Sequence, residues 1–214
     1  VDQYAPLRSE LFIADTDGSN AHKLVPGAEI DYNASFSFDG QWVVFTSERS
    51  GSADIFRAGV DGTGLEQLTN SSAYDDQAAL SPDNRSVAFV SSRGDGSTDI
   101  YIMDIASREV RNLTNSPGGD FRPSWSPDGQ MIAFSSDRDG DDEIFVMDAD
   151  GFNPTQITTN GTDDQSPAWS LALVESVPAT SANGIVILHR NTVGLGQSVD
   201  LGARRIIKKP HTHS

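Results

Sequence analysis

A repeat of 44 to 45 residues runs through the first 170 residues and restricts the folds that this chain can adopt. Serines recur at intervals of 44, 45 and 44 residues, and two sets of apolar positions keep the same intervals. The three sets are Ser37, Ser81, Ser126 and Ser170; Phe12, Phe56, Tyr101 and Phe145; and Leu24, Leu68, Leu113 and Ile157. Three landmarks in one register indicate a repeated structural unit.

Each unit contains four short runs of β-branched and aromatic residues that are separated by turn-forming residues. In the third unit the runs are PSWS, MIAFSS, EIFVMD and PTQIT, and a Pro-Asp-Gly turn follows the first run. Four strands in each repeat are typical of a propeller blade, whose sheet covers the apolar face of its neighbour. The sequence therefore predicts an all-β protein, a β-propeller of four-stranded antiparallel blades. A β-sandwich is the less favoured alternative, because sandwiches do not repeat their turns in register.

The segment WSPDGQMIAFSSDRDGDDEIFVMDADGFNPTQIT, residues 125–158, resembles the WD-repeat-like repeats of TolB-type β-propellers. The resemblance covers residues 11–170 and carries the Pro-Asp-Gly motif of those repeats. It implies a propeller fold and a periplasmic or extracellular location, although no signal peptide is visible. Members of the family include protein-binding scaffolds of bacterial envelopes, gating propellers of prolyl-oligopeptidase-like and tricorn-like peptidases, and some pectin-degrading lyases.

The repeat count predicts about four blades, of which three are complete. LFIADTDG and AHKLV near the start match strands three and four, whereas WSLAL and GIVILHR near the end match strands one and two. If these halves pair, one blade is split between the termini and the ring is closed. The alternative is a partial ring that a second copy of the chain completes. The propeller is expected to span residues 1–193, with a basic, flexible tail at 194–214.

The charge of the chain is divided between these two parts. The whole chain has 31 acidic and 15 basic residues, a net charge of −16, but residues 1–170 alone carry −19 and residues 171–214 carry +3. Such an acidic propeller repels phosphate, so nucleic acid is not expected as a partner. The absence of cysteine excludes disulfides and thiolate metal sites. No apolar run is long enough to predict a transmembrane segment.

The predicted binding site lies where each innermost strand begins. An aspartate stands six residues before every landmark serine, and the residue after it varies from blade to blade. The positions are Asp31 and Tyr32; Asp75 and Asp76; Asp120, Phe121 and Arg122; and Asp164 and Gln165. The aspartates are expected to face the mouth of the central channel and to attract a basic peptide or a hard cation. The favoured alternative for the repeated aspartates is structural, as turn caps or bonds to a neighbouring blade.

A calcium site is a weaker prediction. Asp137, Asp139 and Asp141 alternate around a glycine, as at the start of a calcium loop, but the rest of the EF-hand pattern is missing, so a solvated hairpin is the preferred interpretation. No cofactor is otherwise expected. Nucleophilic catalysis has little support, since no G-x-S-x-G elbow occurs. The three tryptophans, Trp42, Trp125 and Trp169, are interpreted as packing between blades.

Taken together, the sequence favours a non-enzymatic binding module that presents the channel mouth to a protein or peptide, or that binds a second copy of itself. The alternative is a truncated relative of a propeller lyase or the propeller domain of a prolyl-oligopeptidase-like peptidase.

Overall fold

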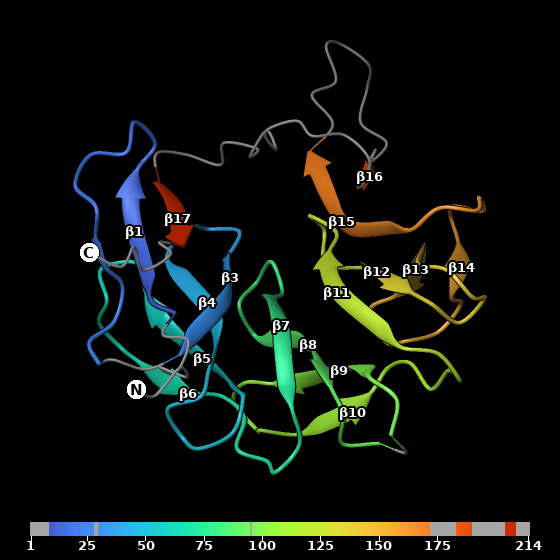
Figure 1. The fold of residues 1–214 in the computed structure, drawn as a ribbon, viewed down its shortest axis with the longest axis horizontal. Helices are drawn as coiled ribbons and strands as arrows, with labels where there is room; N and C mark the ends of the chain where they lie inside the picture. Colours follow the sequence, from blue (N-terminus) through green and yellow to red (C-terminus); the bar gives the residue numbers. More distant parts are fainter. Residues whose placement is uncertain (1–8, 28–29, 95, 172–182, 190–203, 209–214) are drawn as a thin grey trace, which may run out of the picture.

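The computed structural model describes residues 9–27, 30–94, 96–171, 183–189 and 204–208. In this part of the chain every regular element is a β-strand, and no helix long and apolar enough to cross a membrane is found there. The strands form five antiparallel sheets that follow one another along an arc (Figure 1). The prediction of an all-β protein is confirmed.

Three of the sheets are complete four-stranded meanders, which we call blades 1, 2 and 3. Each blade uses its strands in chain order. Blade 1 consists of β3 (Asp31–Phe36), β4 (Trp42–Ser47), β5 (Asp54–Gly59) and β6 (Glu66–Gln67). Blade 2 consists of β7 (Asp75–Leu80), β8 (Ser86–Ser91), β9 (Asp99–Asp104) and β10 (Val110–Asn112). Blade 3 consists of β11 (Asp120–Trp125), β12 (Met131–Ser136), β13 (Glu143–Asp148) and β14 (Thr155–Gln156).

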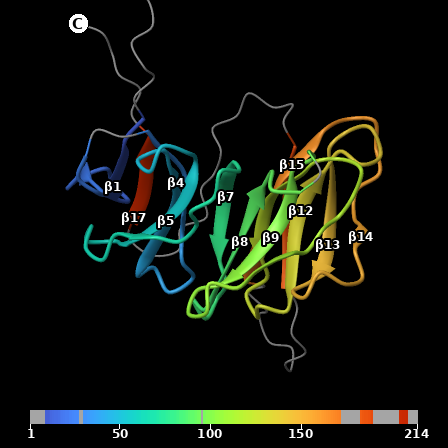
Figure 2. The ribbon, with the colours of Figure 1, turned by 90° about the horizontal axis from the view of Figure 1, so that it is seen from below.

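The first strand of each blade lies nearest the centre of the arc. Figure 1 shows β3, β7 and β11 around this centre, with the short strands β6, β10 and β14 on the outside. The view from below shows the blades as sheets standing side by side (Figure 2). The expected innermost position of the first strand is confirmed.

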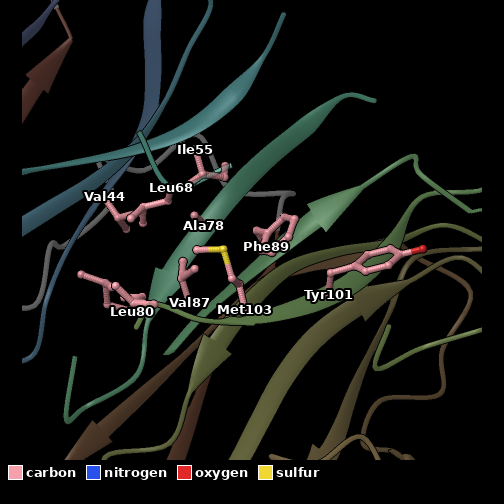
Figure 3. Close-up of a cluster of buried hydrophobic side chains, with 10 residues drawn as sticks. Val44, Ile55, Leu68, Ala78, Leu80, Val87, Phe89, Tyr101 and Met103 are labelled. Atoms are coloured by element: carbon pink, nitrogen blue, oxygen red, sulfur yellow. The ribbon is translucent and has the colours of Figure 1, made fainter. Parts of the chain in front are cut away.

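The hydrophobic core is divided into clusters between neighbouring blades. Val44, Ile55 and Leu68 of blade 1 pack against Leu80 and Phe89 of blade 2 in a cluster that also includes Ala78, Val87, Tyr101, Met103 and Ile105 (Figure 3). A second cluster joins blade 2 to blade 3, and a third joins blade 1 to β1 and the segment that follows β2. Each blade therefore depends on its neighbours to bury its apolar faces.

The landmark serines close the turn between the first two strands of each blade. Ser37 Oγ donates a hydrogen bond to Asp39 Oδ1 at 2.6 Å and accepts one from the Trp42 amide at 2.9 Å. The equivalent bonds in the other two blades are Ser81 with Asp83 and Ser86, and Ser126 with Asp128 and Met131. The serine repeat thus marks a turn that is fixed by its own side chains.

The two ends of the described chain lie in separate sheets. At the start, β1 (Leu11–Asp15) pairs with β2 (His22–Lys23) on one side and with β17 (Arg204–Lys208) on the other. At the end of the repeats, β15 (Asp164–Leu171) pairs with β16 (Asn183–His189).

The terminal strands therefore match the predicted half-blades, but the halves do not join in one sheet. The GIVILHR segment forms β16 beside β15, as expected for a second strand, yet β1 has β17 as its neighbour instead of β16. The described structure is a partial ring, which was the alternative to self-closure. Strand β17 lies within the segment expected to be a flexible tail; the remainder of that segment lies outside the described residues.

Candidate binding site at the inner strands

The aspartates at the start of the inner strands are buried, and three of them form ion pairs within their own blades. Asp75 is 0% exposed, and its Oδ2 lies 2.6 Å from a guanidinium nitrogen of Arg93. The equivalent pairs are Asp31 with Arg49 at 2.9 Å and Asp120 with Arg138 at 2.8 Å. These three carboxylates are therefore occupied by cations of the chain itself.

Each of these arginines is also fixed by aromatic rings. The guanidinium of Arg138 lies 4.4 Å from the ring centre of Phe145 and 5.5 Å from that of Phe134, and its Nε donates to Ser136 Oγ at 2.8 Å. Arg49 and Arg93 have the same ring contacts in blades 1 and 2. The arrangement combines an ion pair with cation–π contacts. Arg49, Arg93 and Arg138 recur in the register of the repeat, a signal that the sequence analysis did not use.

The fourth aspartate, Asp164, is buried at the start of β15. Its Oδ2 accepts a hydrogen bond from Asn160 Nδ2 at 2.6 Å. Asp164 lies opposite His189, so the position equivalent to the blade arginines falls at residue 191, outside the described residues.

A second set of buried carboxylates begins the third strand of each blade. Asp54 accepts hydrogen bonds from Ser52 Oγ at 2.9 Å and from the Ser71 amide at 3.2 Å. Asp99 accepts from Asn112 and Thr114, and Glu143 accepts from Thr158 and from the Asn160 amide. These carboxylates hold the loop after the fourth strand and so belong to the frame of the blade. Sequence reasoning missed them, although they share the 44 to 45 residue spacing.

Every inner strand contains a β-bulge just after its first two residues. In β3, the register passes from Tyr32 opposite Thr46 to Ser35 opposite Val44, so two residues oppose the single residue Phe45. The first of the two residues on the bulged side has a left-handed backbone in each of the four inner strands: Asn33 (φ 48°), Gln77 (φ 54°), Arg122 (φ 54°) and Ser166 (φ 60°). A bulge bends the strand and redirects its side chains.

The bulge residues connect neighbouring blades across the inner strands. Asn33 of blade 1 donates to both carboxylate oxygens of Asp76 in blade 2 at 2.9 Å. Gln77 Oε1 accepts from the Arg122 amide of blade 3 at 2.8 Å, and the Arg122 guanidinium donates to Gln165 Oε1 of β15. We call these five residues the inner belt. Asp76, Arg122 and Gln165 were predicted site residues, whereas Asn33 and Gln77 were not.

Asp76 is also the centre of a small cluster with two tyrosines. It is 1% exposed, and it accepts hydrogen bonds from Thr46 Oγ1 at 2.5 Å and from the Tyr74 hydroxyl. Tyr32, on β3, lies beside Tyr74, Glu48 and Asp76. Burial and the charge of Asp76 raise the pKa of Tyr32 to about 12. Burial and the hydrogen bond to Asp76 raise the pKa of Tyr74 as well, so both phenols stay protonated at neutral pH.

The cluster leaves aromatic surface open at the start of the inner strands. Tyr74 is 43% exposed, and Tyr32 and Phe121 are half-buried. The Phe121 ring lies over Gly119, where an added Cβ would come within 2.4 Å of Cζ. The geometry can therefore offer apolar ring surface and hydrogen-bonding phenols to a ligand, while the nearby carboxylates are held inside.

The three aspartates of the predicted calcium loop are not gathered into a ligand set. Asp137 Oδ1 accepts the Gly119 amide at 2.6 Å, and Asp139 is exposed in the hairpin. Among the described residues, no group of three or more His, Cys, Asp or Glu side chains is arranged to hold a metal ion. Calcium binding stays a prediction from the sequence that this geometry does not support.

Two of the tryptophans connect neighbouring inner strands. Trp125 Nε1 donates to the Ala79 carbonyl at 3.1 Å, and Trp169 Nε1 donates to the Ser124 carbonyl at 2.9 Å. Both bonds cross from one blade to the preceding one, in agreement with their interpretation as packing residues. Trp42 packs against the cluster between blades 1 and 2 and also lies under Arg57, whose guanidinium is 4.7 Å from the ring centre.

Comparisons with known proteins give a matching family model and several relatives that are TolB proteins. The family model described as the TolB β-propeller domain matches residues 6–94 and 78–198. The Tol-Pal system protein TolB of Francisella tularensis is 31% identical over 86 residues, which cover 40% of this chain and 20% of that protein. The crystal structure of TolB from Acinetobacter baumannii superposes with a TM-score of 0.69 at 26% identity, covering 87% of this chain and 49% of that one.

More distant structures share only the fold. Oligogalacturonate lyase from Vibrio parahaemolyticus superposes with a TM-score of 0.54 at 14% identity, covering 76% of this chain and half of the lyase. This chain spans a fifth of the length of the curated TolB protein that it matches and about half of the solved one. Since the family model covers most of the repeat region described above, the chain belongs to the TolB β-propeller domain family.

Proposed function

We propose that this chain is a non-enzymatic binding module, and that the aromatic and polar side chains at the start of its inner strands bind a protein or peptide. The observation that carries the proposal is that different side chains of each blade serve the fold and the surface. The repeated carboxylates and arginines are used inside the blades, whereas the side chains that differ between blades, above all Tyr32, Tyr74 and Phe121, lie where the inner strands begin.

The chemistry of these side chains suits a polypeptide ligand. Tyrosine combines a large apolar ring with a hydroxyl that both donates and accepts, and such residues dominate protein interfaces. The bulge in each inner strand fixes the backbone at this position, so the side chains are held in place before a partner arrives. By the family resemblance we place this activity in the periplasm or outside the cell.

The proposal is tested by selecting peptides from a random library against the whole chain and measuring their binding by fluorescence anisotropy. We expect Tyr74→Ala combined with Phe121→Ala to weaken binding of a selected peptide at least tenfold. Phe152→Ala is the matched control, because Phe152 is 68% exposed on a turn of blade 3 away from the inner strands. Peptides that bind the double variant as tightly as the unchanged chain would show that another surface binds them. Turnover of pectic or peptide substrates by the chain would favour the enzyme alternative.

A further inference from the structure

The junction of blades 2 and 3 contains a pocket at the opposite end of the inner strands from the candidate binding site. It has a volume of about 300 Å³, and the turn that follows β11 borders it. Its walls include Pro82, Ile102, Trp125 and Ala149, and its rim carries the carboxylates of Asp83 and Asp128. A second hollow of about 230 Å³ adjoins it and shares Ser86 and Ile102.

Three differences between equivalent residues explain why the space is open at this junction. Blade 1 has Trp42 at the start of its second strand and Arg57 in its third, stacked at 4.7 Å, whereas blade 2 has Ser86 and Ile102 there. In the turn of the following blade, Asn84 of blade 2 donates to Asp39 Oδ2 at 2.7 Å, whereas blade 3 has Gly129. Each replacement removes side-chain volume from the same place.

The charge around the opening is predominantly negative, although one carboxylate there, Asp83, has the exposed guanidinium of Arg85 at 4.0 Å. The residues that line the two hollows carry four carboxylates, on Asp83, Asp104, Glu109 and Asp128, and a single guanidinium, on Arg111. A hydrogen bond from Ser81 Oγ, together with the amide and the charge of Arg85, lowers the pKa of Asp83. Hydrogen bonds from Ser107 lower the pKa of Asp104, so both carboxylates stay ionised well into the acidic range. A cationic ligand is favoured at this opening, and an anionic one is repelled.

We propose that this pocket binds an arginine side chain of a partner polypeptide, with its aliphatic stem against Ile102 and Pro82 and its guanidinium at the rim carboxylates. Arginine suits the pocket because its planar cation is weakly hydrated and packs on apolar surface. The chain already uses this combination internally, since Arg49, Arg93 and Arg138 each lie between a carboxylate and aromatic rings. The pocket is separate from the site of the proposed function and does not depend on it.

The test uses the peptide Ac-Gly-Arg-Gly-NH₂ and nuclear magnetic resonance of the whole chain labelled with ¹⁵N. We expect the peptide to shift the Trp125 indole signal and the amides of the Ser126–Gly129 turn. The citrulline peptide, which has nearly the same shape without the charge, is expected to bind at least fivefold more weakly. Equal binding of the two peptides would overturn the proposal.

Two variants refill the pocket with residues that junction 1–2 already contains. Ser86→Trp copies Trp42, and Gly129→Asn copies Asn84, whose backbone has the same left-handed conformation (φ 58° against 70°). Each variant is expected to bind the arginine peptide at least fivefold more weakly. The control is Met131→Trp, which changes the equivalent position of blade 3, outside the pocket lining. If the arginine peptide binds both refilled variants as well as the unchanged chain, or if binding to the control variant falls equally, the peptide is attracted to the acidic surface in general. Either result would refute the proposed pocket site. Thermal unfolding of each variant establishes that it is folded. If one of the two refilled variants does not fold, the other alone is enough for the test.

Discussion

The junctions on either side of blade 2 are built from the same repeat but are closed in different ways. Between blades 1 and 2, Asp76 collects hydrogen bonds from Asn33, Thr46 and Tyr74, and at the other end Asn84 reaches Asp39. Between blades 2 and 3, the inner strands are joined by the bond from the Arg122 amide to Gln77, and the turn end is hollow. The repeated frame is the same at both junctions, so the difference shows which positions can change without loss of the fold.

The largest expected loss of stability comes from breaking the repeated aspartate–arginine pairs. This loss should be similar on the two sides of blade 2. Replacing Asp75 or Asp120 by Asn leaves a partly buried guanidinium, Arg93 or Arg138, without its carboxylate, and breaking such a pair costs about 3 kcal/mol. Urea unfolding should give similar losses of free energy for the two variants. A much smaller loss in one of them would mean that the frame is not equivalent in the two blades.

Asp76→Ala should separate the junctions. It removes the shared acceptor of Asn33, Thr46 and Tyr74. Thr46 is buried and is left without that partner, whereas Asn33 and Tyr74 can turn to water, and we expect a loss of about 2 kcal/mol in the free energy of unfolding. Phe121→Ala changes the equivalent half-buried position of blade 3 and should cost about 1 kcal/mol. Equal losses would show that the cluster around Asp76 adds nothing specific to junction 1–2.

Exchanging the residues at positions 42 and 86, which lie at the end of the junctions opposite the candidate binding site, should reduce stability in only one of the two directions. Trp42→Ser removes a ring that packs under Arg57 and against the core between blades 1 and 2, with an expected loss of about 2 kcal/mol. The reverse change, Ser86→Trp, enters an existing pocket and should alter stability by less than about 1 kcal/mol. Calorimetric melting of the two variants measures both effects, and a large loss for Ser86→Trp would contradict the presence of the pocket.

The smallest effect concerns acid stability. Hydrogen bonds from Ser37, the bond from the Gln41 amide and the bond from Asn84 lower the pKa of Asp39 below the ordinary 3.8, against partial burial that raises it. A lowered pKa in the folded state contributes stability above the unfolded pKa, and this is lost as the pH falls through the folded value. Ser37→Ala should therefore raise the pKa of Asp39 and leave that of Asp83 unchanged, measured by carboxyl titration in nuclear magnetic resonance. An equal change in the pKa of Asp83 would show that the shift at Asp39 does not come from its local hydrogen bonds.

The repeat allowed the blades to be predicted because the information for each blade is local and occurs three times. Ser37, Ser81 and Ser126 fix a turn through their own neighbours, and the buried phenylalanines of the second strands lie in short apolar runs that recur with the repeat. The family resemblance and the order of strands were confirmed for the same reason. The pairing of β1 with β17 could not be predicted, because the two strands are almost two hundred residues apart and the repeat stops before β17.

The candidate site was predicted in position but not in detail. The register located the start of each inner strand, yet it did not show that three of the repeated aspartates pair with arginines that follow the second strand of the same blade. The pairing depends on the antiparallel register of the first two strands, which sets Asp31 opposite Ser47, two residues before Arg49. The pocket between blades 2 and 3 was equally out of reach, since it depends on the sizes of Ser86, Ile102 and Gly129, which are distant in the sequence.

The bulge of the inner strands has a consequence for how such a chain can diversify. Because each bulge adds one residue, a blade can use the side chain at the bend to hold its neighbour, and the preceding side chain, such as Phe121, can be used for another purpose. Selection can then act on the one position while the other maintains the ring. The position proposed for recognition and the position that holds the next blade can then vary separately, although they lie one residue apart.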